Sequence, residues 1–167
     1  MDRYVNVFFL CLIAGSVFAM GSGAGSSGSS GGGTASGGGS GTSQLEVDSQ
    51  ALRFYHEGVR AVNSKNFAQA QAKFEQALTE NPKFAEAHNS LGYALQMEGP
   101  QYYPIALEHY NRAIQLKPNL AQAYEYRGVL LLRMDRKTAA ENDLATLKAL
   151  KSNLAAELER VINTRKE

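Results

Sequence analysis

The sequence predicts an all-α protein in which a pair of helices is repeated along the chain. Two observations support this prediction. First, equivalent residues recur at a nearly fixed spacing: Gly58 and Gly92 are 34 residues apart, while Gly92 and Gly128, like Pro82 and Pro118, are 36 apart. Second, apolar residues between these positions recur every three or four residues, as one face of an amphipathic helix requires.

The N-terminal residues 1–19 are expected to be a secretory signal or a membrane anchor. Positive charge at the N-terminus precedes an apolar run from Tyr4 to Phe18, and Val17 and Ala19 fit a small-residue cleavage site. An apolar run of about fifteen residues is shorter than the roughly twenty that a membrane span needs. We therefore expect an exported protein, periplasmic or secreted, with a mature N-terminus at Met20. The alternative is an uncleaved segment that tethers the protein to a membrane.

Residues 20–44 are predicted to form a disordered linker. Residues 21–43 of this stretch are almost entirely Gly, Ser, Ala and Thr, with no charge and no large apolar side chain. Such a composition cannot bury enough apolar surface to offset the entropy cost of ordering the chain.

The composition changes at about residue 45, and residues 45–167 are expected to form the helical repeat domain. The first copy of the repeat spans about residues 51–84 and contains two apolar stripes with helical spacing, separated by a polar turn at residues 63–66. The stripes are Ala51, Phe54, Gly58, Ala61 and Val62, then Phe67, Ala70, Phe74, Ala77 and Leu78. Asn81–Pro82 ends the copy, because proline disfavours helix at the residue before it.

The second copy, about residues 85–120, carries two extra residues. The repeat spacing changes from 34 to 36 between Gly92 and Ala106, so we expect a longer turn around residues 97–100. The two helices of this copy are predicted at residues 84–96 and 104–116.

The period and the residue types at these offsets resemble the tetratricopeptide repeat. The resemblance rests on the glycines, on the Ala70–Phe74–Ala77 and Ala106–Tyr110–Ala113 patterns, and on the closing prolines. It implies an antiparallel helix-pair solenoid of three repeats over roughly residues 51–152. It also implies a function in binding other proteins, without naming the partner.

The third copy, about residues 121–152, follows the family pattern less closely. Leu147 stands where a small residue is usual, and Ser152 replaces the closing proline. Its helices are predicted at residues 119–134 and 136–150. A last segment, residues 152–164, has Leu154, Leu158, Val161 and Ile162 on one face and charges on the other. We expect it to be a capping helix, with Ser152 as its N-cap, that covers the open end of the stack.

The resemblance also assigns a binding surface. In this family the first helix of each repeat lines a concave groove, and its outward side contacts partners. The predicted groove residues are Tyr55, Val59, Asn89, Tyr93, Gln96, Tyr126 and Arg133, accompanied by Val62, Glu125 and Val129. Tyrosine offers a large contact area with a polar tip, and amides can bond both N–H and C=O groups of a peptide.

These groove residues have two other interpretations. One variant of the family holds the C-terminal carboxylate of chaperones with basic residues and asparagines. The corresponding positions here carry Tyr55, Val59, Gln122 and Tyr126, so that clamp is absent. The tyrosines could also pack only between neighbouring repeats and bind nothing.

Candidate chemistry is sparse, and we expect no enzyme, no cofactor and no metal site. His56, His88 and His109 lie on different predicted helices without the close spacing of a metal motif, and no phosphate-binding loop is present. A net charge of +1 with interspersed charges argues against nucleic-acid binding. The single cysteine, Cys11, lies in the apolar leader and could be lost with it.

The sequence therefore predicts a non-catalytic interaction module or adaptor in a cell-envelope or secretory assembly. Its partner is expected to be a peptide or protein, with membrane contact only through an uncleaved N-terminal segment. The alternative is a structural protein that associates with itself as a homo-oligomer.

Overall fold

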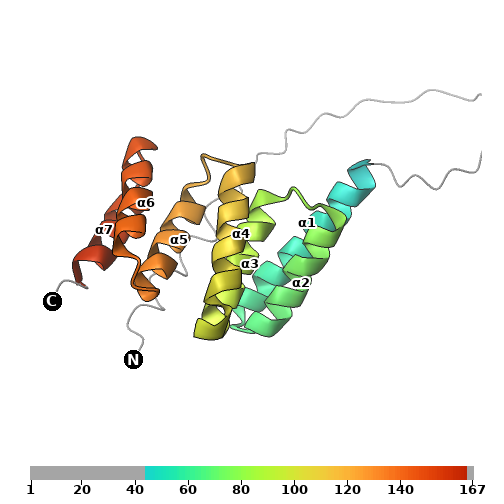
Figure 1. The fold of residues 1–167 in the computed structure, drawn as a ribbon. Helices are drawn as coiled ribbons and strands as arrows, with labels where there is room; N and C mark the ends of the chain where they lie inside the picture. The colour runs from blue at the N-terminus through green and yellow to red at the C-terminus, as the bar shows by residue number, and fades with distance from the viewer. Residues whose placement is uncertain (1–43, 165–167) are drawn as a thin grey trace, which may run out of the picture. The chain divides into compact units, whose positions relative to one another are not determined.

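The computed structural model describes residues 44–164 of the chain, and every regular element in that part is helical (Figure 1). The predicted leader, residues 1–19, and nearly all of the predicted linker, residues 20–44, lie outside the described residues. No helix in the described part is both long enough and apolar enough to span a membrane.

Six of the helices form three consecutive pairs, and the seventh follows them. The elements are α1 (Gln44–Asn63), α2 (Phe67–Glu80), α3 (Ala85–Glu98), the short 3₁₀ helix η2 (Pro100–Tyr102), α4 (Tyr103–Leu116), α5 (Ala121–Arg133), α6 (Lys137–Ala149) and α7 (Leu154–Thr164). Each helix packs on the next one along the chain, and α7 packs on both α5 and α6 (Figure 1). The predicted all-α stack of helix pairs with a last helix is confirmed.

Small and aromatic side chains on the second helix of each pair form the centre of the stack. The buried residues of α2, α4 and α6 recur at equivalent positions. They are Ala70, Phe74 and Ala77, then Ala106, Tyr110 and Ala113, and then Ala140, Leu144 and Leu147, together with Asp143. Alanines let two helices approach closely, while the large residue between them fills the space in the middle of the pair.

Glycines on the first helices make these close approaches possible. A Cβ atom added to Gly58 would lie 2.5 Å from the ring of Phe74, and one added to Gly92 would lie 2.9 Å from the ring of Tyr110. Both contacts are with the partner helix of the same pair.

The third pair departs from this arrangement. A Cβ atom added to Gly128 would lie 2.6 Å from Leu158 of α7. The residue of α6 at the position of Phe74 and Tyr110 is Leu144, whose side chain is shorter than an aromatic ring. The last helix therefore supplies the side chain that packs on Gly128, and α7 is part of the core of the third pair as well as its cover.

Three of the turns share one hydrogen-bond pattern. After α1, the Lys65 N–H donates to the Val62 carbonyl and the Asn66 N–H donates to the Ala61 carbonyl, at 2.8 and 2.9 Å. This pair of bonds is the Schellman motif that ends many helices. The turns after α5 and α6 repeat it, with Asp135 and Lys151 in the left-handed conformation that Lys65 also adopts.

The turn inside the second pair differs, as the change of spacing predicts. Gly99 has φ +139°, and η2 follows it before α4 begins at Tyr103. The two extra residues thus lengthen the turn, and α3 and α4 remain paired in the same way as α1 and α2.

Candidate functional site

The predicted groove residues lie on the first helices of the three pairs, α1, α3 and α5. We call the sides of these helices that carry the seven residues the first-helix face. Arg133 is exposed, and Tyr55 and Val59 are half-buried. Asn89, Tyr93, Gln96 and Tyr126 are buried, with exposed fractions of 3–7%. The central residues of the face are therefore less open in the structure than an exposed groove would require.

The tyrosines are buried because they pack across the boundary between helix pairs. The ring centroids of Tyr93 on α3 and Tyr126 on α5 are 5.3 Å apart. The ring centroids of Phe67 and Tyr93 are 6.3 Å apart, and so are those of Tyr110 and Tyr126. Contacts of this kind contribute about 0.5–1.5 kcal/mol each beyond the area they bury. The alternative in which the tyrosines pack between repeats is thus part of the observed structure, and partner binding by this face stays a prediction.

Gln96 has a partner inside the fold. Its Oε1 accepts a hydrogen bond of 2.9 Å from the hydroxyl of Tyr110, which is fully buried in the second pair. Burial raises the pKa of Tyr110 well above its usual range, so this hydroxyl stays protonated and remains a donor. Gln96 therefore fixes the ring of Tyr110, a role that the sequence did not predict.

Tyr55 occupies the corresponding place between the first and second pairs. Its ring lies 5.0 Å from that of Phe84 and 5.7 Å from that of Phe74. Burial raises its pKa, against a hydrogen bond with the Ser90 side chain that lowers it. The face thus carries aromatic rings from α1 to α5.

Two buried oxygens on the first-helix face lack a hydrogen-bond partner among the described residues. They are Oδ1 of Asn89 on α3 and Oε2 of Glu125 on α5. Burial and, to a smaller extent, the Glu157 carboxylate on α7 together raise the pKa of Glu125 to about 7. Buried polar groups are normally paired in folded proteins, so these two atoms stand out within the face.

Glu125 makes folding stability depend on pH. Its pKa is higher in the folded chain than the ordinary value of 4.5, so the folded chain binds more protons between that pH and about 7. The contribution of this protonated carboxyl group to the free energy of unfolding is fully present below pH 4.5. It is lost as the pH rises to about 7. We expect Glu125→Gln to raise the free energy of unfolding above pH 7 by about 3 kcal/mol, with no gain below pH 4.5.

Urea unfolding of both proteins across this pH range would measure the difference. Comparing variant with wild type removes the contribution of His88 and His109, which are present in both. If Glu125→Gln raises the free energy of unfolding equally at all pH values, the Glu125 carboxyl does not titrate in the buried state described here.

His88 and His109 come together across the second pair. Their Nδ1 atoms are 3.0 Å apart, and the rings stack with centroids 5.3 Å apart. Burial lowers the pKa of both, that of His109 to about 4 with the His88 charge opposing protonation as well. At neutral pH both rings are therefore neutral, and one donates to the other. Sequence reasoning missed this contact because the two residues lie on different helices, 21 positions apart.

No group of three or more His, Cys, Asp or Glu side chains in residues 44–164 is arranged to hold a metal ion. The histidine pair forms a packing and hydrogen-bonding contact between α3 and α4.

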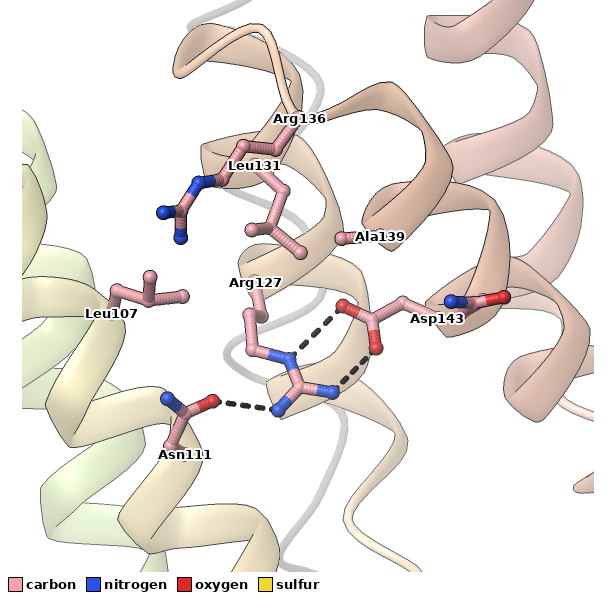
Figure 2. Close-up of a pocket in the computed structure, with 8 residues that line it drawn as sticks. Leu107, Asn111, Arg127, Leu131, Arg136, Ala139 and Asp143 are labelled. Carbon is pink, nitrogen blue, oxygen red and sulfur yellow. Dashed lines mark hydrogen bonds and ion pairs between the residues drawn. The ribbon is translucent and has the colours of Figure 1, made fainter.

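A pocket of about 270 Å³ lies between α4, α5 and α6. Figure 2 shows Arg127 at its centre, with Arg136 and the apolar side chains of Leu107, Leu131 and Ala139 around it. Asn111, Asn142 and Asp143 complete the lining.

Arg127 joins the second and third helix pairs. Its Nε and Nη2 donate to the two oxygens of Asp143 at 3.0 and 2.5 Å, and its Nη1 donates to Oδ1 of Asn111 at 2.6 Å. The Asp143 side chain is only 3% exposed. Burial raises its pKa, whereas the bonds and the charge of Arg127 lower it. A two-point pair of this kind fixes both side chains in position within the third pair, and the bond to Asn111 connects Arg127 to the second pair.

Comparisons with known proteins agree with the repeat pattern. A tetratricopeptide-repeat model matches residues 55–99, and a TPR-repeat model matches residues 102–135. The chain contains tetratricopeptide repeats.

Two curated relatives carry the same repeat. Over 89 residues, 53% of this chain, the sequence is 38% identical to tetratricopeptide repeat protein 6 of Homo sapiens. Over 110 residues, 64% of this chain, it is 31% identical to tetratricopeptide repeat protein 36 of Xenopus tropicalis. The matched stretches cover 16% and 54% of these relatives, so the chain spans only part of their length.

Solved tetratricopeptide-repeat structures share the fold. The first TPR domain of Spaghetti (RPAP3), bound to the HSP90 peptide SRMEEVD, matches 71% of this chain and 94% of its own length, with a TM-score of 0.64 and 17% identity. At this identity the match shows the fold alone.

The structure also locates the four clamp positions of the tetratricopeptide-repeat variant that holds carboxylates. Tyr55, Val59 and Gln122 are half-buried, and Tyr126 is buried. None of these side chains carries a positive charge. The site therefore differs in its chemistry from a carboxylate clamp, although the helices that carry it are arranged in the same way.

Proposed function

We propose that this chain is a non-catalytic adaptor that binds a peptide or protein partner on its first-helix face. The observation that carries the proposal is the aromatic cluster of Tyr93 and Tyr126, which occupies the middle of that face between α3 and α5. Large aromatic side chains at the centre of a surface are the groups that most often dominate binding energy.

The repeat family supports the same conclusion. The first TPR domain of Spaghetti, which shares this fold, is bound to an HSP90 peptide. In this chain the face adds partly exposed Tyr55 and Val59 on α1 and exposed Arg133 on α5 to the central tyrosines. These residues extend across all three helix pairs, which suits contact with an extended segment.

We place this adaptor in a cell-envelope or secretory assembly. The support is the apolar leader followed by a Gly/Ser-rich stretch in the sequence. In this proposal the protein is exported and is periplasmic or secreted, either free after cleavage or tethered by an uncleaved leader. Mass spectrometry of the exported protein would decide between the two, since cleavage leaves Met20 at the N-terminus.

The central tyrosine provides the test of the face. We expect Tyr93→Ala to weaken binding of the partner by about 2 kcal/mol, roughly thirtyfold. Partners would first be captured from an envelope fraction with the full chain, and the affinity of the captured protein would then be measured by calorimetry. Tyr93 is 7% exposed, so the variant will also unfold more easily and must be measured well below its melting temperature.

A matched control is Tyr102→Ala in η2, a tyrosine at the turn of the second pair. Its affinity should stay within about threefold of wild type. If Tyr93→Ala binds as wild type does, the first-helix face is not the site. Sedimentation at several concentrations tests the structural alternative, because self-association requires the mass to rise with concentration.

A further inference from the structure

The unpaired oxygens of Asn89 and Glu125 occupy equivalent places on neighbouring first helices. They are separated by 36 residues, the same repeat spacing that relates Gly92 to Gly128. These residues are 5% and 2% exposed, yet Oδ1 of Asn89 and Oε2 of Glu125 have no hydrogen-bond partner among the described residues. Two buried acceptors are thus presented by adjacent helices in the same register.

The contact between α3 and α5 brings these two positions into one region. Tyr93 lies one helical turn after Asn89, and its ring packs against Tyr126, the residue that follows Glu125. Residues four apart on a helix share a face. The acceptors therefore border the aromatic cluster at the centre of the first-helix face.

The charge that acts on Glu125 is negative. Burial and the Glu157 carboxylate both act on Glu125, and no lysine or arginine is among the groups that shift its pKa. Glu157 itself is held by Arg160 of α7 at 2.9 Å. Arg133, the exposed arginine of α5, is eight residues beyond Glu125, about 12 Å along the helix.

We propose that Asn89 and Glu125 bind a basic side chain of the partner, so that the first-helix face selects a segment carrying arginine or lysine. This inference rests on the proposed function and adds the chemistry of the partner to it. A guanidinium has five N–H donors in one plane, and can bond an amide oxygen and a carboxylate oxygen together. The positive charge that the first-helix face selects in this proposal is opposite in sign to the net charge of the peptide SRMEEVD bound to the Spaghetti domain.

The physical reason is the cost of the unpaired state. Leaving a buried acceptor without a donor is unfavourable, and bonds to charged groups are stronger than those between neutral groups. A basic side chain would supply the missing donors and the missing positive charge in one contact. Because both acceptors are nearly closed off in the chain alone, binding must include a side-chain rearrangement between α3 and α5.

Binding should also release protons. The pKa of Glu125 is about 7, so roughly half of the molecules carry a proton there at neutral pH. A cation placed beside the carboxyl favours its charged form, which lowers the pKa and expels that proton. Compared with the proton release of Glu125→Gln, this readout distinguishes contact with Glu125 from contact elsewhere on the protein.

A random-peptide library displayed on phage is a suitable probe for the full chain. We expect the wild type to enrich peptides with arginine or lysine at one fixed position. Glu125→Gln should lose that preference and bind the best peptide about 10- to 100-fold more weakly. Glu108→Gln, an equal change of charge at an exposed site on α4, should bind as wild type does. Calorimetry of the selected peptide in two buffers should show proton release by the wild type alone and not by Glu125→Gln.

The outcomes separate this inference from the proposed function. Enriched peptides that lack a basic position but lose affinity in Tyr93→Ala would overturn the inference and support the binding face. Basic peptides whose affinity is unchanged by Glu125→Gln would also overturn it. If the wild type enriches no peptide at all, both the peptide-binding face and its preference for basic residues are wrong.

Discussion

Replacing Gly92 with leucine is expected to lower the free energy of unfolding by about 3 kcal/mol or more, at the upper end of the cost of overpacking a core. Even the first added carbon would lie 2.9 Å from the Tyr110 ring and 3.1 Å from the backbone oxygen of Ala106. The ring cannot move aside easily, because Tyr110 is fully buried and its hydroxyl is bonded to Gln96. The leucine must therefore push α3 away from α4.

Thermal and urea unfolding followed by circular dichroism would measure this loss. The control is Glu108→Leu, which places the same side chain on an exposed position of α4 and should change stability by under about 0.5 kcal/mol. If Gly92→Leu unfolds at the wild-type midpoint, α3 and α4 do not pack as described.

Removing Arg127 is the second change for which we expect a large effect. Arg127→Met should lower the free energy of unfolding by about 3 kcal/mol, because it leaves Asp143 buried without its partner. The Asp143 side chain is 3% exposed and receives two bonds from Arg127. Loss of the third bond, to Asn111, also weakens the connection between the second and third pairs.

The double variant Arg127→Met/Asp143→Leu tests this explanation. Removing both charges leaves no buried carboxyl unpaired, so most of the lost stability should return. The deficit of Arg127→Met should also shrink as the pH falls, since burial raises the pKa of Asp143 and a protonated carboxyl needs no cation. A double variant less stable than Arg127→Met would contradict this account. So would a deficit that does not change with pH.

The fold was predictable because the residues that define the repeat pattern are those whose size decides how closely two helices can pack. Gly58 and Gly92 allow close contact with the partner helix, where the rings of Phe74 and Tyr110 lie against them. The two extra residues of the second pair were also predictable, because an insertion changes the otherwise fixed spacing between equivalent residues of the repeats. The contact of Gly128 with α7 was not predicted, because the repeat pattern says nothing about a helix that follows the last copy.

The site was predicted less well. The repeat pattern identifies which helices form the face, but the exposure of Tyr93 and Asn89 depends on how their neighbours pack. Likewise, the His88–His109 contact and the bonds from Arg127 to Asp143 join residues on different helices. Nothing in the spacing of these residues distinguishes them from ordinary surface charges and rings. Only the positions of the helices in space bring them together.

The Schellman turns have a consequence for how the sequence can change. Lys65, Asp135 and Lys151 each hold a left-handed backbone that glycine adopts at lower cost, by roughly 1 kcal/mol. The chain thus accepts three small strains at equivalent turns while keeping a charged side chain at each. Substituting glycine at any of these three turns should therefore raise the free energy of unfolding without changing the first-helix face. Once a substitution has removed one of these strains, the more stable protein can tolerate later destabilising changes elsewhere, which leaves its binding residues freer to evolve toward a new partner.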